Sequence, residues 1–187
     1  TPAPVNSTVS ISNLYNYWVW FQDWLNSVVF DWTNYVAVWK TFTIANWNQF
    51  SIVKFNSSFS ILAASTIWWS SNDEFNSITY DWSNYVAVWY SDSDLSWLGW
   101  TTTNNTNYVI AKFDTNLSLL AINNAWPANN ETFNSVISDW TNYIAVWQSD
   151  SDLSWYWSWT VSGWNYDSLI AKFDSSLNRV QLHNTWW

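Results

Sequence analysis

Short apolar runs alternate with clusters of Asp, Asn and Ser along most of this chain. In its middle part the apolar runs cover residues 75–80, 84–90, 107–113 and 117–123. Each run has six or seven residues and is rich in Val, Ile, Leu, Tyr or Phe, whereas the breaks carry turn-forming residues. This pattern predicts β-strands, because branched and aromatic side chains suit a pleated, half-buried surface. No stretch keeps the 3.6-residue period of an amphipathic helix, so we expect an all-β protein.

The strand pattern occurs three times. "DWTNYVAVWK" begins at Asp31, "DWSNYVAVWYSDSDLSW" at Asp81 and "DWTNYIAVWQSDSDLSW" at Asp139, at spacings of 50 and 58 residues. Four predicted strands in a unit of this length are typical of a propeller blade. We therefore expect a β-propeller-like array of about three four-stranded antiparallel blades. One large sandwich would not require such similar units, and the coils of a β-solenoid are usually much shorter.

The expected organisation is one repeat domain over residues 1–187. Residues 1–24 are expected to be a linker and the last strand of a preceding unit, and the three units are 25–74, 75–132 and 133–187. Propellers typically have about four to eight blades, so three blades do not close a ring. The chain is therefore predicted to be an incomplete part of a larger propeller, extended by further repeats or completed by self-association.

Tryptophan occupies positions where turns need glycine. The chain has 21 tryptophans and 2 glycines. In the first hairpin of each unit, tryptophan follows aspartate where Asp-Gly is the usual pair, because the second residue needs a positive φ. These residues are Trp32, Trp82 and Trp140. A second set fills a strand position at which a small residue would permit close approach of the backbone; it comprises Trp39, Trp89 and Trp147.

The repeated "NYVAVW" strand and the "IAKFD" motif at residues 110–114 and 170–174 resemble the bacterial β-propeller repeat called the SBBP repeat. The resemblance covers residues from about 25 to 187, and "IAKFD" is its most specific part. It implies a propeller fold, with glycine where this chain has tryptophan. We hypothesise that the gene reads the codon UGA as glycine and was translated with a code that reads UGA as tryptophan.

The alternative is that the tryptophans are genuine and form a stacked aromatic array. Such an array could bind sugars, because indole faces stack on pyranose rings. Genuine tryptophans at these turns would be expected to distort the hairpins or to make the protein poorly soluble.

The composition excludes several classes of partner. Lys and Arg total 5 against 14 Asp and Glu, a net charge of −9, so the chain lacks the basic surface that nucleic acids and anionic membranes attract. There is no cysteine for a disulfide or thiolate site, and a single histidine, His183, excludes a multi-histidine zinc site. His183 is expected to have a structural or surface role. No apolar run is long enough to span a membrane.

The "SDSDLS" loops contain the metal candidates of this sequence. Alternating carboxylates form part of a calcium-binding pattern, and the residues concerned are Asp92, Asp94, Asp150 and Asp152. The preferred interpretation of the same residues is a solvated inter-strand loop with an Asx turn. No cofactor other than calcium is predicted.

Other polar residues recur in every unit. An exposed strand position is expected for Lys54, Lys112 and Lys172. The hairpin before the fourth strand is expected to begin at Asp114 and Asp174. Residues copied into each unit favour a scaffold over an enzyme, since a catalytic centre is usually unique. No catalytic set is predicted.

These observations lead to an expected role. Only 10% of the residues are charged, and a polar, uncharged surface favours an extracellular or cell-surface setting. We expect a non-catalytic binding or scaffold module whose variable loops contact a polysaccharide or another surface protein. The alternatives are an accessory carbohydrate-binding segment of a secreted hydrolase and a propeller completed by self-assembly.

Overall fold

The computed structural model describes six parts of the chain, residues 23–42, 48–67, 73–91, 107–124, 132–149 and 167–184. These residues form twelve β-strands and no helix. The predicted all-β class and the four strands of each unit are therefore confirmed. Residues 1–22, which include most of the expected linker and preceding strand, lie outside the described residues.

The strands form three sheets of four. The first sheet consists of β1 (Asp23–Phe30), β2 (Tyr35–Phe42), β3 (Asn48–Phe55) and β4 (Ile61–Ile67). The second consists of β5 (Asp73–Tyr80), β6 (Tyr85–Ser91), β7 (Asn107–Phe113) and β8 (Leu119–Asn124). The third consists of β9 (Thr132–Ser138), β10 (Tyr143–Ser149), β11 (Asp167–Phe173) and β12 (Arg179–Asn184). Each sheet is an antiparallel meander whose strands pair in chain order.

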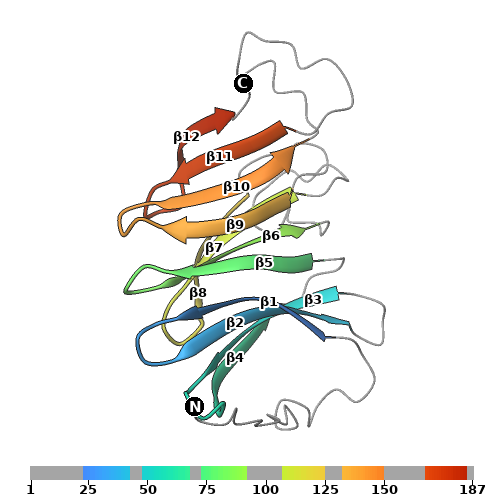
Figure 1. Ribbon diagram of the computed structural model, residues 1–187, viewed down its shortest axis with the longest axis vertical. Helices are drawn as coiled ribbons and strands as arrows, with labels where there is room; N and C mark the ends of the chain where they lie inside the picture. The colour runs from blue at the N-terminus through green and yellow to red at the C-terminus, as the bar shows by residue number, and fades with distance from the viewer. Residues whose placement is uncertain are drawn as a thin grey trace, which may run out of the picture.

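The three sheets stack along the long axis of the molecule (Figure 1). The first strand of each later sheet packs on the sheet before it: β5 lies against β1, β2 and β3, and β9 lies against β5, β6 and β7. The hairpins β1–β2, β5–β6 and β9–β10 turn at the same edge of the stack (Figure 1). The first and third sheets lie at opposite ends, so the array is propeller-like but not closed.

A bulge in the first strand directs a side chain toward the next sheet. The register of β1 shifts between Leu25 and Ser27, and that of β5 shifts at the equivalent place. A bulge leaves one residue out of the ladder and changes the direction of its side chain. In these two sheets that residue is an asparagine: the Nδ2 group of Asn26 donates to the carbonyl of Phe75 at 2.5 Å, and that of Asn76 donates to the carbonyl of Phe133 at 2.5 Å.

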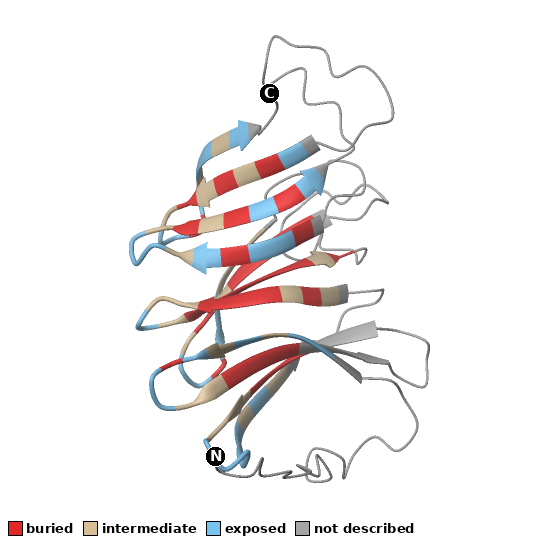
Figure 2. Ribbon diagram, in the orientation of Figure 1, coloured by how far each residue is buried: buried red, intermediate tan, exposed pale blue. Residues whose placement is uncertain are grey.

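The core has two parts, one at each contact between sheets. Successive residues of a strand face opposite sides of the sheet. In β6, Tyr85, Ala87 and Trp89 therefore face the first sheet, and Val86 and Val88 face the third. All five are fully buried, because both faces of the second sheet are covered (Figure 2). This double coverage explains why the "YVAVW" run is continuously apolar.

Candidate functional site at the sheet junctions

The hairpin between the first two strands has the same geometry in all three sheets. The Oδ1 atom of Asp31 accepts hydrogen bonds from the backbone amides of Thr33 (3.0 Å) and Asn34 (2.6 Å). Asp81 and Asp139 accept the equivalent pairs of amides at 2.7–3.0 Å. These Asx turns fix the backbone without help from glycine. The three hairpins therefore share one hydrogen-bonded geometry.

The residue after each of these aspartates has a positive φ, as the sequence predicts. The angle is 70° at Trp32, 74° at Trp82 and 74° at Trp140. The left-handed region costs an L-residue about 1–2 kcal/mol. The same strain occurs in the hairpin between the third and fourth strands, where the residues at positive φ are Phe59, Leu117 and Leu177. The sequence does not predict that second set, because leucine and phenylalanine are poor indicators of such a turn.

The three hairpin tryptophans form an exposed row along the edge of the stack. The ring centroids of Trp32 and Trp82 are 5.1 Å apart with the rings nearly parallel, and those of Trp82 and Trp140 are 5.2 Å apart. Between 54% and 62% of each residue is exposed. Trp82 has a ring on each side, so neither of its faces is open to a sugar. The stacked rings connect neighbouring hairpins. Only the ring faces of Trp32 and Trp140 that point away from Trp82 are free to stack on a ligand.

The Oδ2 atoms of Asp31 and Asp81 each join two sheets. Asp31 forms an ion pair with Lys54 of β3 at 2.9 Å, and it accepts a hydrogen bond from the hydroxyl of Tyr85 in the next sheet. Lys54 also donates to the Tyr85 hydroxyl oxygen at 3.0 Å and to the carbonyl of Thr115 at 3.3 Å. We call this set of aspartate, lysine and following tyrosine the junction network.

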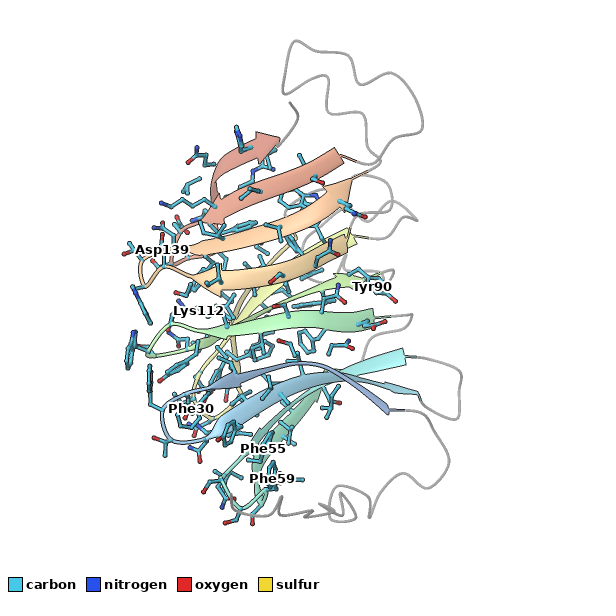
Figure 3. The ribbon with its side chains drawn as sticks, viewed as in Figure 1. Phe30, Phe55, Phe59, Tyr90, Lys112 and Asp139 are labelled. Carbon is cyan, nitrogen blue, oxygen red and sulfur yellow. The ribbon has the colours of Figure 1, made fainter. Side chains whose placement is uncertain are left out.

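The second contact between sheets repeats the junction network. Asp81 lies 3.6 Å from the Nζ atom of Lys112 and accepts a hydrogen bond from Tyr143. Lys112 also donates to the carbonyl of Ser175 at 3.0 Å. Its ammonium group lies 5.3 Å from the centre of the Tyr143 ring, which adds a cation–π contact. Figure 3 labels Lys112 and Asp139 on the edge where the hairpins turn.

Burial and hydrogen bonding act in opposite directions on the junction carboxylates. Burial raises the pKa of Asp31, but hydrogen bonds from Tyr85, from the amides of Asn34 and Thr33 and from Lys54 outweigh it and lower the pKa to about 2. The pKa of Asp81 is lowered in the same way. Burial, together with the adjacent carboxylates, raises the pKa of Tyr85 and of Tyr143. Both junctions therefore hold a carboxylate against a protonated phenol.

The third sheet carries only half of a junction network. Asp139 and Lys172 are 3.9 Å apart, with 45% and 36% of their side chains exposed. The corresponding exposures are 5% and 12% for Asp31 and Lys54. Among the described residues no later sheet supplies a tyrosine to Asp139. The amides of Asn142 and Thr141 lower its pKa.

These contacts correct one prediction from the sequence. Lys54 and Lys112 are not exposed, because each bridges a carboxylate of its own sheet and is covered by the next sheet. Lys172 is closer to the expectation, since its side chain is 36% exposed and no following sheet is found in the described part of the chain. The role of the tyrosines was not among the predictions from the sequence. The available signal was that Tyr35, Tyr85 and Tyr143 recur four residues after the hairpin aspartate in every unit.

Two large indoles also differ from the expectation of a small-residue position. Trp89 and Trp147 are at most 2% exposed. They fill the core and contact phenylalanines edge to face, Trp89 against Phe75 at 5.0 Å and Trp147 against Phe133 at 5.2 Å. The indole side chains therefore fill the space that a close approach of the backbone would otherwise occupy. The side chain of Trp39 lies outside the described residues.

Other candidates from the sequence have mixed outcomes. Asp114 and Asp174 do begin the hairpin before the fourth strand, since the amide of Leu117 donates to the Asp114 carbonyl and that of Leu177 to the Asp174 carbonyl, both at 3.0 Å. His183 is exposed on β12, as expected. The calcium candidates lie outside the described residues: Asp92, Asp94, Asp150 and Asp152.

The arrangement of the junction limits its chemistry. In Asp31, Oδ1 accepts two amides and Oδ2 contacts an ammonium group and a phenol, so no oxygen is directed at solvent for proton transfer or metal binding. Within the described residues, no three His, Cys, Asp or Glu side chains gather into a metal site. The same residues contain no helix long and apolar enough to cross a membrane.

No family model matches this chain, and no curated protein matches it. The resemblance to the SBBP repeat therefore stays a prediction.

Proposed function

We propose that this chain is a non-catalytic binding or scaffold module that works outside the cell or at its surface. One observation carries the proposal: at both sheet junctions the recurring aspartate and lysine pair with each other, and a tyrosine of the next sheet donates to the aspartate. Their carboxylates and ammonium groups are occupied by structural partners. The low charged fraction of 10% supports the extracellular setting.

The proposed partner is a polysaccharide or another surface protein. Sedimentation with insoluble cellulose, chitin and peptidoglycan, followed by assay of released reducing sugar, tests the proposal. Binding without release of sugar supports a non-catalytic module. Release of sugar by the purified chain would show that it is an enzyme and would overturn the proposal.

The exposed tryptophan row favours a second candidate, an accessory carbohydrate-binding segment of a secreted hydrolase. The outer face of Trp140 is available to a pyranose ring, whereas Trp82 lies between two other indoles. For this candidate, Trp140→Ala weakens sedimentation with the polysaccharide. Val180→Ala is the matched control, because Val180 is 55% exposed on β12 and lies outside the row. Equal binding by both variants contradicts a role for the row.

A further inference from the structure

We propose that the third sheet binds the first sheet of a second copy of this chain, so that copies associate head to tail. The inference deepens the proposed scaffold role and rests on it. It concerns the two end faces of the stack, defined here by their residues. The forward face belongs to the third sheet and includes Ile137, Ile144 and Val146. The rear face belongs to the first sheet and includes Leu25, Val28 and Tyr35.

The forward face is apolar, although no later sheet among the described residues covers it. In the first sheet the residues equivalent to Ile144 and Val146 are Val36 and Val38, and both are 0% exposed because the second sheet packs on them. In the third sheet, Val146 is 36% exposed and Ile137 is 63% exposed. Figure 2 shows exposed segments on the strands of the third sheet. A face that is covered twice within one chain is therefore presented a third time, and none of the described residues covers it there.

The rear face carries the matching apolar residues. In the second sheet, Phe75 (0% exposed) and Ile78 (5%) pack onto the first sheet. The register places Leu25 and Val28 at the same positions of the first sheet, opposite the second strand. Leu25 is 64% exposed and Val28 is 58% exposed. The first sheet can therefore pack on a second copy through the same apolar positions by which the second sheet packs on the first.

Polar groups at the two faces complete the match. Tyr35 holds the position of Tyr85 and Tyr143, which donate to the aspartate of the preceding sheet. Asp139 holds the position of the accepting aspartates, and its pair with Lys172 is open to solvent. Docking brings the Tyr35 hydroxyl of one copy to Asp139 of another and completes the third junction network.

The bulge asparagine supplies a further contact. Asn26 and Asn76 each donate to a backbone carbonyl of the following sheet. Asn134, at the same position of the third sheet, is exposed. In the docked pair its amide donates to the carbonyl of Leu25, which is the counterpart of Phe75. None of the contacts named for this interface involves a tryptophan.

A second copy is favoured over an unrelated partner because one chain holds both halves of the junction. The occupant of the forward face must provide a phenol and two apolar side chains in a strand and hairpin of fixed register, and the first sheet provides all three. Such an interface is heterologous, so it produces a ring if the rotation closes and a filament if it does not. The charge of −9 on each copy opposes association, so salt should strengthen it by screening the repulsion.

The test is sedimentation velocity of the 187-residue chain over a range of concentrations and salt. We expect larger species to form with rising concentration, and more readily at high salt. Val146→Asp places a charge in the forward face and should weaken association at least about tenfold, which corresponds to about 1.4 kcal/mol. Val180→Asp is the matched control, because Val180, Leu120 and Leu62 hold equivalent positions and are 53–55% exposed in all three sheets, covered or not.

A double-mutant cycle tests the predicted hydrogen bond. Tyr35→Phe and Asp139→Asn should each weaken association, and the double variant should be less affected than the sum of the two, because both remove one contact. Circular dichroism confirms that each variant is folded. A monomer at every concentration, or equal effects of Val146→Asp and Val180→Asp, overturns the inference. Polysaccharide binding by that monomer would leave the proposed binding function intact.

Discussion

The hydroxyl of Tyr85 donates a hydrogen bond to the carboxylate of Asp31, which lies 54 residues earlier in the chain and in a different sheet. Tyr143 and Asp81 have the same relationship one sheet further along. Each contact pairs a charged acceptor with a buried phenol and is reinforced by a lysine. The sheets are therefore connected to their immediate neighbours by one repeated polar contact within an apolar interface.

Replacing Tyr85 with phenylalanine should destabilise the protein. A hydrogen bond to a charged group contributes about 1.5–3 kcal/mol, and Tyr85→Phe leaves the buried Asp31 with one fewer donor. The free energy of unfolding from urea titration measures the loss. Tyr35→Phe, measured at a dilution that favours the monomer, is the control because no preceding sheet among the described residues supplies a carboxylate to it. Equal losses in both variants would contradict the role of the junction.

Acid should weaken the first junction at a pH lower than usual for aspartate. The pKa of Asp31 is lowered to about 2 in the folded protein, whereas an unfolded aspartate has a pKa of about 3.9. The unfolded state therefore takes up its proton first, and the stabilisation is present above pH 4 and lost as the pH falls from about 4 to about 2. Urea titrations at about pH 6, 4, 3 and 2 measure this loss of stability. Asp31→Asn should lose less stability over the same interval, and an identical loss would show that Asp31 is not responsible.

Alkali should act through the tyrosines. The pKa of Tyr85 and of Tyr143 is raised above the ordinary value by burial and by the adjacent aspartates. Their stabilisation is full below the unfolded pKa of about 10 and is lost as the pH rises through the higher folded pKa, since the unfolded state releases the proton first. The test is to measure the absorbance of phenolate and the extent of unfolding together at about pH 11. At this pH an unperturbed tyrosine is already ionised. If all ten tyrosines ionise near their ordinary pKa while the protein stays folded, the prediction is wrong.

The hairpin strain can be isolated at one position. Trp82→Gly and Trp82→Ala both lose the stacked rings, but only glycine adopts φ near 74° without a β-carbon clash. The glycine variant should be more stable than the alanine variant by about 1 kcal/mol. Ser83, at the next position, lacks a positive φ and serves as the control site. There alanine should be at least as stable as glycine, and the same preference at both sites would exclude the strain as the cause.

The mass of the native protein tests the decoding hypothesis. If UGA is read as glycine in the source organism, the protein is lighter than the printed sequence by one indolylmethyl group at each recoded position. The leucines at positive φ show that bulky residues occur at such turns without UGA. A mass that fits 21 tryptophans would reject the hypothesis.

The strands and first hairpins could be predicted because their signals are local. Alternation of apolar and polar residues fixes a strand, and an aspartate before a residue at positive φ fixes the turn. The burial of Lys54 could not be predicted in this way. Its environment is set by Tyr85, in another sheet, and by the hairpin carboxylate of its own sheet. A lone lysine in a strand is usually exposed, so local evidence favours the wrong environment.

The tyrosines Tyr85 and Tyr143 belong to a repeated sequence pattern that indicates their contacts. Tyr85 and Tyr143 look like ordinary apolar strand residues, since β-strands are rich in tyrosine. Their recurrence together with an aspartate and a lysine in each unit is what distinguishes them. Three residues that recur together in every unit, with the tyrosine always four residues after the aspartate, indicate a contact between neighbouring units. The loops that would carry a ligand differ from unit to unit, and no such rule applies to them.

The division of each junction between two sheets affects how a gene of this kind can lengthen. A DNA segment that encodes one sheet also encodes a forward half, the aspartate and lysine, and a rear half, the tyrosine. An in-frame duplication of that segment therefore creates a complete new junction at once, without compensating mutations elsewhere. Since each unit contacts only its neighbours, selection can change the number of units while it conserves a single set of contact residues.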